Sequence, residues 1–255
     1  MVALAAGTAL TASGASASPV FPAGFNPGGL MQHVGSSSAR AAGGISHQTS
    51  TTSTNWSGYA ATTGTYTSVS ASWTQPKGTC TSGDQYAAFW VGLDGYTSSS
   101  VEQTGSEVDC VGRTAQYYAW YEMYPGASEN YSNTVKAGDH FNASVTYEGS
   151  NKFSLYIADT TQNWSHTTVQ TLANAARSSA EVIIEAPCCT NSGGILNLTN
   201  FGTINLTSSE ANGAAIGNAG GLVQITMTDS QGRDRDSVTS LSGGENFSAT
   251  WIRDN

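Results

Sequence analysis

The sequence predicts an all-β protein built as an antiparallel sandwich of two sheets, and three observations lead to this fold class. Short alternating segments dense in Thr, Val, Tyr and Trp recur between residues 66 and 253, and these residue types favour strands. Gly, Asn, Ser and Asp separate the segments, as expected of turns between strands. No 3.6-residue apolar pattern competes with them. Regular short strands of this kind are typical of a sandwich or barrel.

The expected strands follow one another with short gaps as far as residue 186. They lie at 66–74, 86–93, 101–104, 116–124, 140–147, 152–158, 166–172, 180–186, 222–228 and 247–253. The segment 188–221 is rich in Asn, Gly and Ser and predicts long loops with one short strand at 195–198. A chain of 255 residues with this pattern is expected to form one sandwich domain, which we place at 54–255.

The N-terminal region differs in composition from the rest. Residues 1–17 form a small-residue, mildly apolar run ending in Ala15-Ser16-Ala17, which fits a secretory signal peptide; a disordered Ala/Ser/Gly tail is the alternative. No Lys or Arg precedes the run, so we expect the basic start of a leader to be missing. Residues 18–53 are rich in Gly, Ser, Ala and Pro and predict a disordered propeptide or linker. Secretion into the extracellular medium is therefore expected.

The four cysteines suit an oxidising compartment, where they would pair in one of three connectivities. Cys80 and Cys110 flank a plausible strand pair and are the preferred bridge. Cys188 and Cys189 would then form a vicinal disulfide or stay reduced.

Charge and missing motifs exclude several function classes. The net charge is −9, so neither nucleic acid nor an anionic membrane is an expected partner. Metalloprotease, nucleophile-elbow, phosphate-loop and Cys-x-x-Cys motifs are all absent from the sequence, and so is the aspartic peptidase triplet. No cofactor or metal is expected: Asp229, Asp234 and Asp236 could hold calcium, but a solvated loop is the preferred interpretation. His140 and His166 lack an obvious Ser and Asp partner.

Two expected strands carry acids among apolar or aromatic residues. In 180–187, Glu181, Ile183 and Glu185 share one face, and Pro187 ends ladder pairing. Glu185 is therefore either a solvated rim residue or a working carboxylate. In the expected strand at 117–125, the side chains on one face are those of Tyr118, Trp120, Glu122 and Tyr124, because side chains alternate along a strand. That face indicates a groove for an extended polymer, or else an ordinary aromatic core stripe.

Five stretches in order resemble the glutamic peptidases, the eqolisin family of secreted acid proteases. They are Asn55-Trp56-Ser57-Gly58-Tyr59, Trp90-Val91-Gly92-Leu93-Asp94-Gly95, Gln103-Thr104-Gly105, Ala119-Trp120-Tyr121-Glu122-Met123-Tyr124-Pro125 and Ala180-Glu181-Val182-Ile183-Ile184-Glu185. The resemblance implies a concanavalin A-like sandwich of two antiparallel sheets. The chain departs from fungal members at Tyr118, where they tend to carry Asp, and at Glu102, where they tend to be aliphatic.

The resemblance further implies that Gln103 and Glu185 form a catalytic pair on neighbouring strands of a concave sheet face. The residues implied to line or support the groove are Trp56, Trp90, Asp94, Trp120, Glu122 and Tyr124. Glu185 would take a proton from the attacking water and return it to the leaving amine, while the Gln103 amide would bind the oxyanion.

The expected function is a monomeric secreted acid endopeptidase acting on polypeptides. The alternative is a carbohydrate-binding or glycoside-hydrolysing sandwich that uses the tryptophans as stacking platforms, or Glu122 with Glu185 as its acid pair.

Overall fold

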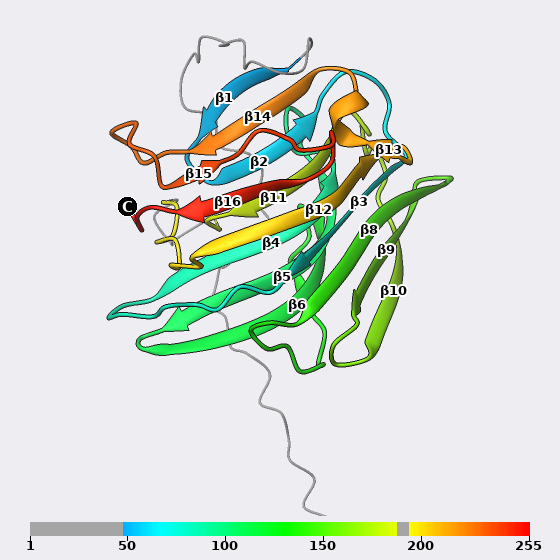
Figure 1. The fold of residues 1–255 in the computed structure, drawn as a ribbon. Helices are drawn as coiled ribbons and strands as arrows, with labels where there is room; N and C mark the ends of the chain where they lie inside the picture. The colour runs from blue at the N-terminus through cyan, green and yellow to red at the C-terminus, as the bar shows by residue number, and fades with distance from the viewer. Residues whose placement is uncertain (1–47, 188–193) are drawn as a thin grey trace, which may run out of the picture.

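The computed structural model describes residues 48–187 and 194–255, which form two stacked β-sheets (Figure 1). In spatial order, the first sheet contains β1 (Thr49–Ser53), β14 (Leu222–Met227), β2 (Trp56–Ala61), β11 (Ala180–Glu185), β4 (Gln85–Leu93), β5 (Val101–Val111), β6 (Thr114–Tyr124) and β7 (Glu129–Asn130). The second contains β10 (Trp164–Thr171), β9 (Lys152–Asp159), β8 (His140–Gly149), β3 (Ser68–Thr74), β12 (Thr203–Ala211), β16 (Phe247–Trp251) and β15 (Asp236–Val238). Short β13 (Ala214–Ala215) pairs with β12, and the 3₁₀ turn η1 (Ile216–Asn218) follows it.

The strand pairs confirm the antiparallel sandwich. Among the named strands, only β1 and β14 run parallel to each other. One apolar cluster fills the space between the sheets and draws on both, for example Phe89 and Val182 from the first and Phe141 and Leu155 from the second. No helix in the described residues is long and apolar enough to cross a membrane.

A second apolar cluster lies on the face of the first sheet that is turned away from the second sheet. We call this the outer face. It contains Trp56, Trp90, Trp120 and Ile183. Because alternate side chains of a strand point to opposite faces, the expected alternation in β6 and β11 is confirmed: Trp120 and Ile183 are on the outer face, while Ala119 and Val182 are between the sheets.

Ten of the expected strands exist, with shifted ends, but the loop prediction for 188–221 is wrong in its second half. Residues Thr203–Ala211 form β12, which lies between β3 and β16. Its alternation is real, since Ile204, Leu206 and Ala211 are buried. The exposed residues Asn205, Thr207 and Ser208 between them mask the signal. At 195–198 the chain makes an isolated bridge from Leu198 to Tyr86 instead of a strand.

The boundary between linker and domain also needs correction. Residues Thr49–Ser53, assigned by composition to the propeptide, form β1 and pair with β14. Ser53 is fully buried, and its hydroxyl accepts a hydrogen bond from the backbone N–H of Trp56 at 3.1 Å. The folded sheet therefore includes Thr49–Ser53, ahead of the expected start at residue 54.

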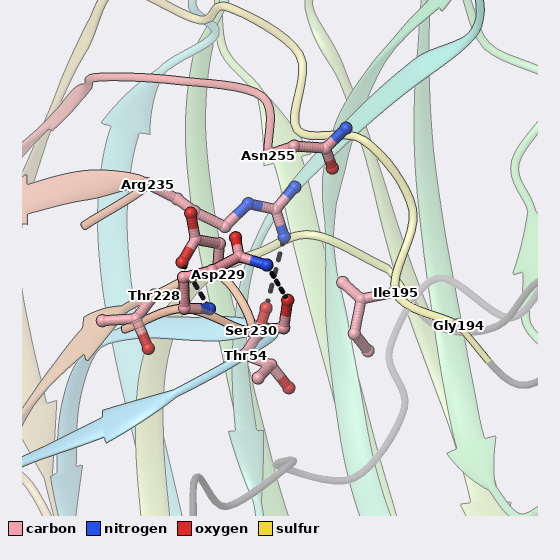
Figure 2. A pocket seen from close by; sticks show the side chains of 9 residues that line it. Thr54, Gly194, Ile195, Thr228, Asp229, Ser230, Arg235 and Asn255 are labelled. Atoms are coloured by element: carbon pink, nitrogen blue, oxygen red, sulfur yellow. Dashed lines mark hydrogen bonds between the residues drawn. The ribbon is translucent and has the colours of Figure 1, made fainter. Parts of the chain in front are cut away.

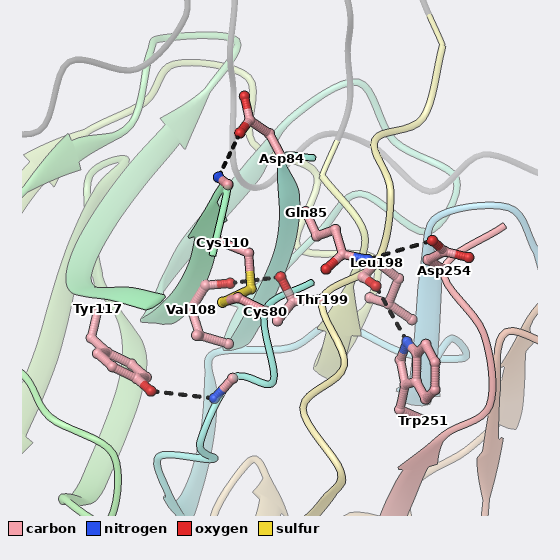
Figure 3. Close-up of a disulfide and its surroundings, with 12 residues drawn as sticks. Cys80, Asp84, Gln85, Val108, Cys110, Tyr117, Leu198, Thr199, Trp251 and Asp254 are labelled. Atoms are coloured by element: carbon pink, nitrogen blue, oxygen red, sulfur yellow. Dashed lines mark hydrogen bonds between the residues drawn. A yellow bond between two sulfur atoms is a disulfide. The ribbon is translucent and has the colours of Figure 1, made fainter. Parts of the chain in front are cut away.

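The preferred disulfide is present. Cys80 and Cys110 are bonded, with 5.3 Å between their Cα atoms, and the bridge ties the segment before β4 to the end of β5 (Figure 3). Beside it, the Thr199 hydroxyl donates to the Val108 carbonyl at 3.2 Å. Cys188 and Cys189 lie outside the described residues. The bridge helps to fix the β4–β5 pair, whose outer face carries part of the candidate site.

Candidate active site

Three rows of side chains cross the outer face, each row running over β2, β11, β4, β5 and β6 in that order. The first row is Trp56, Glu185, Ala88, Glu107 and Tyr118; the second is Gly58, Ile183, Trp90, Gly105 and Trp120; the third is Ala60, Glu181, Gly92, Gln103 and Glu122. The acids and the amide occupy the outer two rows, and the middle row between them is apolar. The structure thus brings six of the eight expected site residues into these three rows.

Glu185 ends β11 in the first row and is fully buried. Its Oε2 accepts a hydrogen bond from the Trp90 indole N–H at 2.9 Å, and its Oε1 accepts one from the Asn55 amide at 3.3 Å. Both of these donors are neutral groups that orient the carboxyl by hydrogen bonding. The structure therefore excludes the solvated-rim interpretation of Glu185.

Trp90 reaches from the middle row to Glu185 because glycines leave room for its ring. A Cβ on Gly105, its neighbour on β5, would lie 2.6 Å from the Trp90 Cβ and 2.2 Å from the Phe89 carbonyl oxygen. On its other side Trp56 makes an edge-to-face contact with Trp90, with 4.9 Å between ring centroids. The indole is thus held in place by packing as well as by its hydrogen bond.

Gly105→Ala is expected to displace Trp90 and to lower the free energy of unfolding by about 1–3 kcal/mol, because the added methyl has no space. Loss of the Trp90 hydrogen bond to Glu185 should lower any activity that uses this carboxyl. Thermal denaturation and indole fluorescence measure the effect. Val111→Ala, at a position 48% exposed on the same strand, is the control and should change little; equal stability of the two variants would contradict the packing account.

Gln103 is in the third row and is fully buried. Its side-chain nitrogen donates to Glu122 Oε2 at 2.7 Å, across the β5–β6 pair. This contact fixes which end of the amide faces Glu122. A carboxyl partner on β6 thus orients the Gln103 side chain.

The expectation that Gln103 and Glu185 lie on neighbouring strands is wrong. Strand β4 separates β5 from β11, and the two residues are in different rows. In a flat sheet this diagonal would place their Cα atoms roughly 16 Å apart. A substrate bond that both side chains touch would have to lie between them, above Trp90.

Asp94 lies just past β4 and supports a turn. Its backbone has φ 72°, and its carboxylate accepts hydrogen bonds from the backbone N–H groups of Arg177 at 2.7 Å and Ser178 at 2.8 Å. These contacts hold the chain entering β11. Asp94 is fully buried and fixes the position of the strand that carries Glu181 and Glu185.

Glu102 and Glu181 are buried close to Asp94. Burial, with the Asp94 charge adding to it, raises the pKa of Glu102 to about 8. Burial likewise raises the pKa of Glu181 well above its usual range. As alternation predicts, Glu102 points to the opposite face from Gln103. Both glutamates thus favour the neutral carboxyl form at mildly acidic pH.

Sequence reasoning missed three residues of the outer face: Asn55, Glu107 and Asp109. Asn55 was noted only as part of a motif. Glu107 and Asp109 were missed because the predicted strand ended at Thr104, whereas β5 continues to Val111. Because alternate residues of a strand share a face, a strand continued past Thr104 would have placed Glu107 and Asp109 on the same face as Gln103. The remaining expected residue, Tyr124, is half-buried against the outer-face cluster.

A cavity of about 460 Å³ is lined by none of the residues of the three rows; its lining includes Thr54, Ile195, Thr228, Asp229 and Arg235 (Figure 2). The buried Arg235 guanidinium donates to the backbone carbonyls of Thr54 at 3.2 Å and Leu196 at 2.9 Å. None of the eight expected site residues lines this cavity. Arg235 therefore anchors the backbone next to Asn55.

No contact in the described residues supports a calcium site at Asp229, Asp234 and Asp236 or a catalytic role for His140 or His166. Asp236 is not in a solvated loop: it is fully buried in β15, and its carboxyl accepts hydrogen bonds from the Ser57 hydroxyl and the Met227 N–H. No group of three potential metal ligands occurs in the described part of the chain. His166 stacks on Tyr131, and exposed His140 contacts Thr74. Both histidines belong to the second sheet, away from the outer face.

The protein is a β-sandwich of two stacked antiparallel sheets, and buried carboxyl and carboxamide groups are collected on the outer face of one of them. The model of the peptidase A4 family matches residues 54–251. The chain belongs to this family, the glutamic peptidases.

Two curated relatives and several solved structures are similar to the chain. Aspergillopepsin-2 of Aspergillus niger is 26% identical over 173 residues, which cover 65% of this chain and 59% of the relative. Scytalidopepsin B of Scytalidium lignicola is 31% identical over 151 residues, 55% of each protein. The chain thus spans somewhat more than half the length of these relatives.

Among solved structures, scytalido-glutamic peptidase with a transition state analog inhibitor superposes with TM-score 0.68 at 22% identity, covering 78% of this chain and 98% of that one. Aspergilloglutamic peptidase from Aspergillus niger gives 0.57 at 22% identity, covering 66% of this chain and 99% of that one. At this identity the two superpositions establish the shared fold.

Proposed function

We propose that the protein is a secreted endopeptidase that hydrolyses peptide bonds in acid medium, with Glu185 as the base and Gln103 as the oxyanion donor. The observation that carries the proposal is the presence of both side chains on one buried face of a glutamic peptidase fold, on either side of the middle row.

The chemistry follows from the two functional groups. Ionised Glu185 removes a proton from water as the water attacks the carbonyl carbon, and later returns it to the leaving nitrogen. Gln103 never ionises, so its N–H can bind the developing oxyanion at any pH. Glu122 accepts from the same amide group and sets its direction. No cofactor takes part in this scheme.

Trp56, Trp90, Trp120 and Tyr124 would line the groove in which an extended polypeptide binds. Asp94 would contribute indirectly, because its carboxylate holds the turn before β11.

The test is cleavage of a denatured protein at pH 2 to 6, with new N-termini counted, run beside polysaccharide binding and reducing-sugar release. Peptide cleavage by the purified chain is the expected result. Sugar release without peptide cleavage would overturn the proposal and favour the carbohydrate alternative, with Glu122 and Glu185 as acids.

Processing is expected to remove a signal peptide and propeptide, now with an earlier boundary. Because Thr49–Ser53 pairs with β14 and Ser53 caps the start of β2, the mature N-terminus should fall before Thr49. N-terminal sequencing of active secreted protein measures this. A fully active form that begins after Ser53 would contradict it.

A further inference from the structure

A second carboxyl group faces Glu185 on the outer face. Glu107 on β5 occupies the same row as Glu185 on β11, and only Ala88 of β4 stands between them. Across two strand spacings the Cα atoms are roughly 10 Å apart, and the alanine methyl fills little of that space. Two long acidic side chains therefore approach the same region from opposite sides.

Glu107 is fully buried, and its carboxyl group interacts with that of Asp109, two residues further along β5. A buried carboxyl beside a second carboxyl is costly to keep ionised, so it retains its proton. A protonated carboxyl has one O–H to donate. Glu107 is thus a buried proton donor on the outer face.

The groups around Glu107 also favour the neutral form. Burial raises its pKa well above the usual range, and the nearby carboxyls of Asp109, Glu185 and Glu122 add to the effect. The titratable groups that face it are Asp109 on its own strand, Tyr118 and Glu122 on β6, Glu185 on β11 and Tyr86 on β4. None of these groups is basic, so no cation in this set stabilises an ionised Glu107.

We propose that Glu107 is a further catalytic residue, the general acid that protonates the leaving amine when the peptide bond breaks. The proposal rests on the proposed function of Glu185 and Gln103. In the step, the C–N bond breaks, its electron pair goes to nitrogen, and nitrogen takes the proton of Glu107. Glu107 thus takes over from Glu185 the delivery of a proton to the leaving nitrogen. Glu185 keeps the proton taken from water, and its transfer to ionised Glu107 restores both groups for the next turnover.

The experiment compares wild type and Glu107→Gln on peptides whose leaving groups are substituted anilines of increasing acidity. Glutamine keeps the size and neutrality of the side chain but supplies no acidic proton. For the most basic aniline, kcat/KM should fall roughly 10²- to 10⁴-fold, the usual contribution of a general acid. For p-nitroaniline, which departs with less need of a proton, the loss should shrink markedly.

Glu102→Gln is the matched control, because Glu102 is equally buried on β5 but points to the opposite face. It should show no dependence on the leaving group. A uniform loss across the anilines in Glu107→Gln, or no loss, would overturn the proposal.

The pH profile on a protein substrate supplies a second readout. Wild-type kcat/KM should fall as Glu107 ionises at higher pH, whereas residual activity in Glu107→Gln should lack that limb. If wild type cleaves peptides but Glu107→Gln matches it, only this inference fails. If wild type cleaves no peptide, the proposed function itself fails.

Discussion

Glu185→Gln should reduce kcat on a denatured protein substrate by roughly 10²- to 10⁴-fold, the range expected when a general base is lost. The substitution keeps the shape and can keep an acceptor for the Trp90 indole, which donates to Glu185 at 2.9 Å. It removes only the ability to take a proton. Gln103→Ala should cost roughly 10²- to 10³-fold through the lost oxyanion donor, mainly in kcat.

Glu181→Gln is the matched comparison for this series. Glu181 is on the same strand and the same face as Glu185, and both are fully buried. It is the residue directly across Gly92 from Gln103. Glu181→Gln should retain most activity, with folding of all variants checked by circular dichroism. An inactive Glu181→Gln variant beside an active Glu185→Gln variant would show that Glu181, and not Glu185, is the base.

The fold should be more stable at pH 4 than at pH 8, by an amount on the order of a few kcal/mol. The cause is a set of buried carboxyls with raised pKa values: Glu102 at about 8, and Glu107 and Glu181 well above their usual range. A group whose pKa is higher in the folded state binds more protons there than in the unfolded chain. The free energy of unfolding therefore falls as pH rises from about 4.5 through the folded-state pKa.

Thermal or urea denaturation across pH 3 to 8 measures this slope. Glu102→Gln should flatten it between pH 5 and 8, because glutamine does not titrate. Glu148→Gln, at an exposed position, should leave the slope unchanged. The opposite contribution of Asp229, whose pKa is lowered mainly by the hydrogen bonds of Arg233, acts only below about pH 4. A wild-type chain equally stable at pH 4 and pH 8 would refute the account.

Periodicity in the sequence was enough to predict the sandwich and the faces of its acid-bearing strands. Alternation alone placed Trp120 with Glu122 and Ile183 with Glu185, because side chains of a strand point to its two faces in turn. The motif order was enough to suggest the family. The strand pair flanked by Cys80 and Cys110 was enough to favour their bridge. Each of these depends on local spacing along the chain.

Strand β12 and the second half of β5 escaped sequence reasoning for a local physical reason. In β12 the exposed residues include Asn, Thr and Ser, which favour loops when considered without their neighbours. In β5 Gly105 has low strand propensity, yet it is required there because the Trp90 side chain occupies the space of a Cβ. Packing across the sheet decided both cases.

Only the tertiary structure decided which acids face one another. Register between strands far apart in sequence set Glu107 opposite Glu185 and Glu181 opposite Gln103, and placed β4 between the two strands of the proposed catalytic pair. No spacing within one strand contains that information. The chain by itself thus determined a glutamic peptidase sandwich with acids on one face, whereas strand pairing and burial determined which of them can keep a proton.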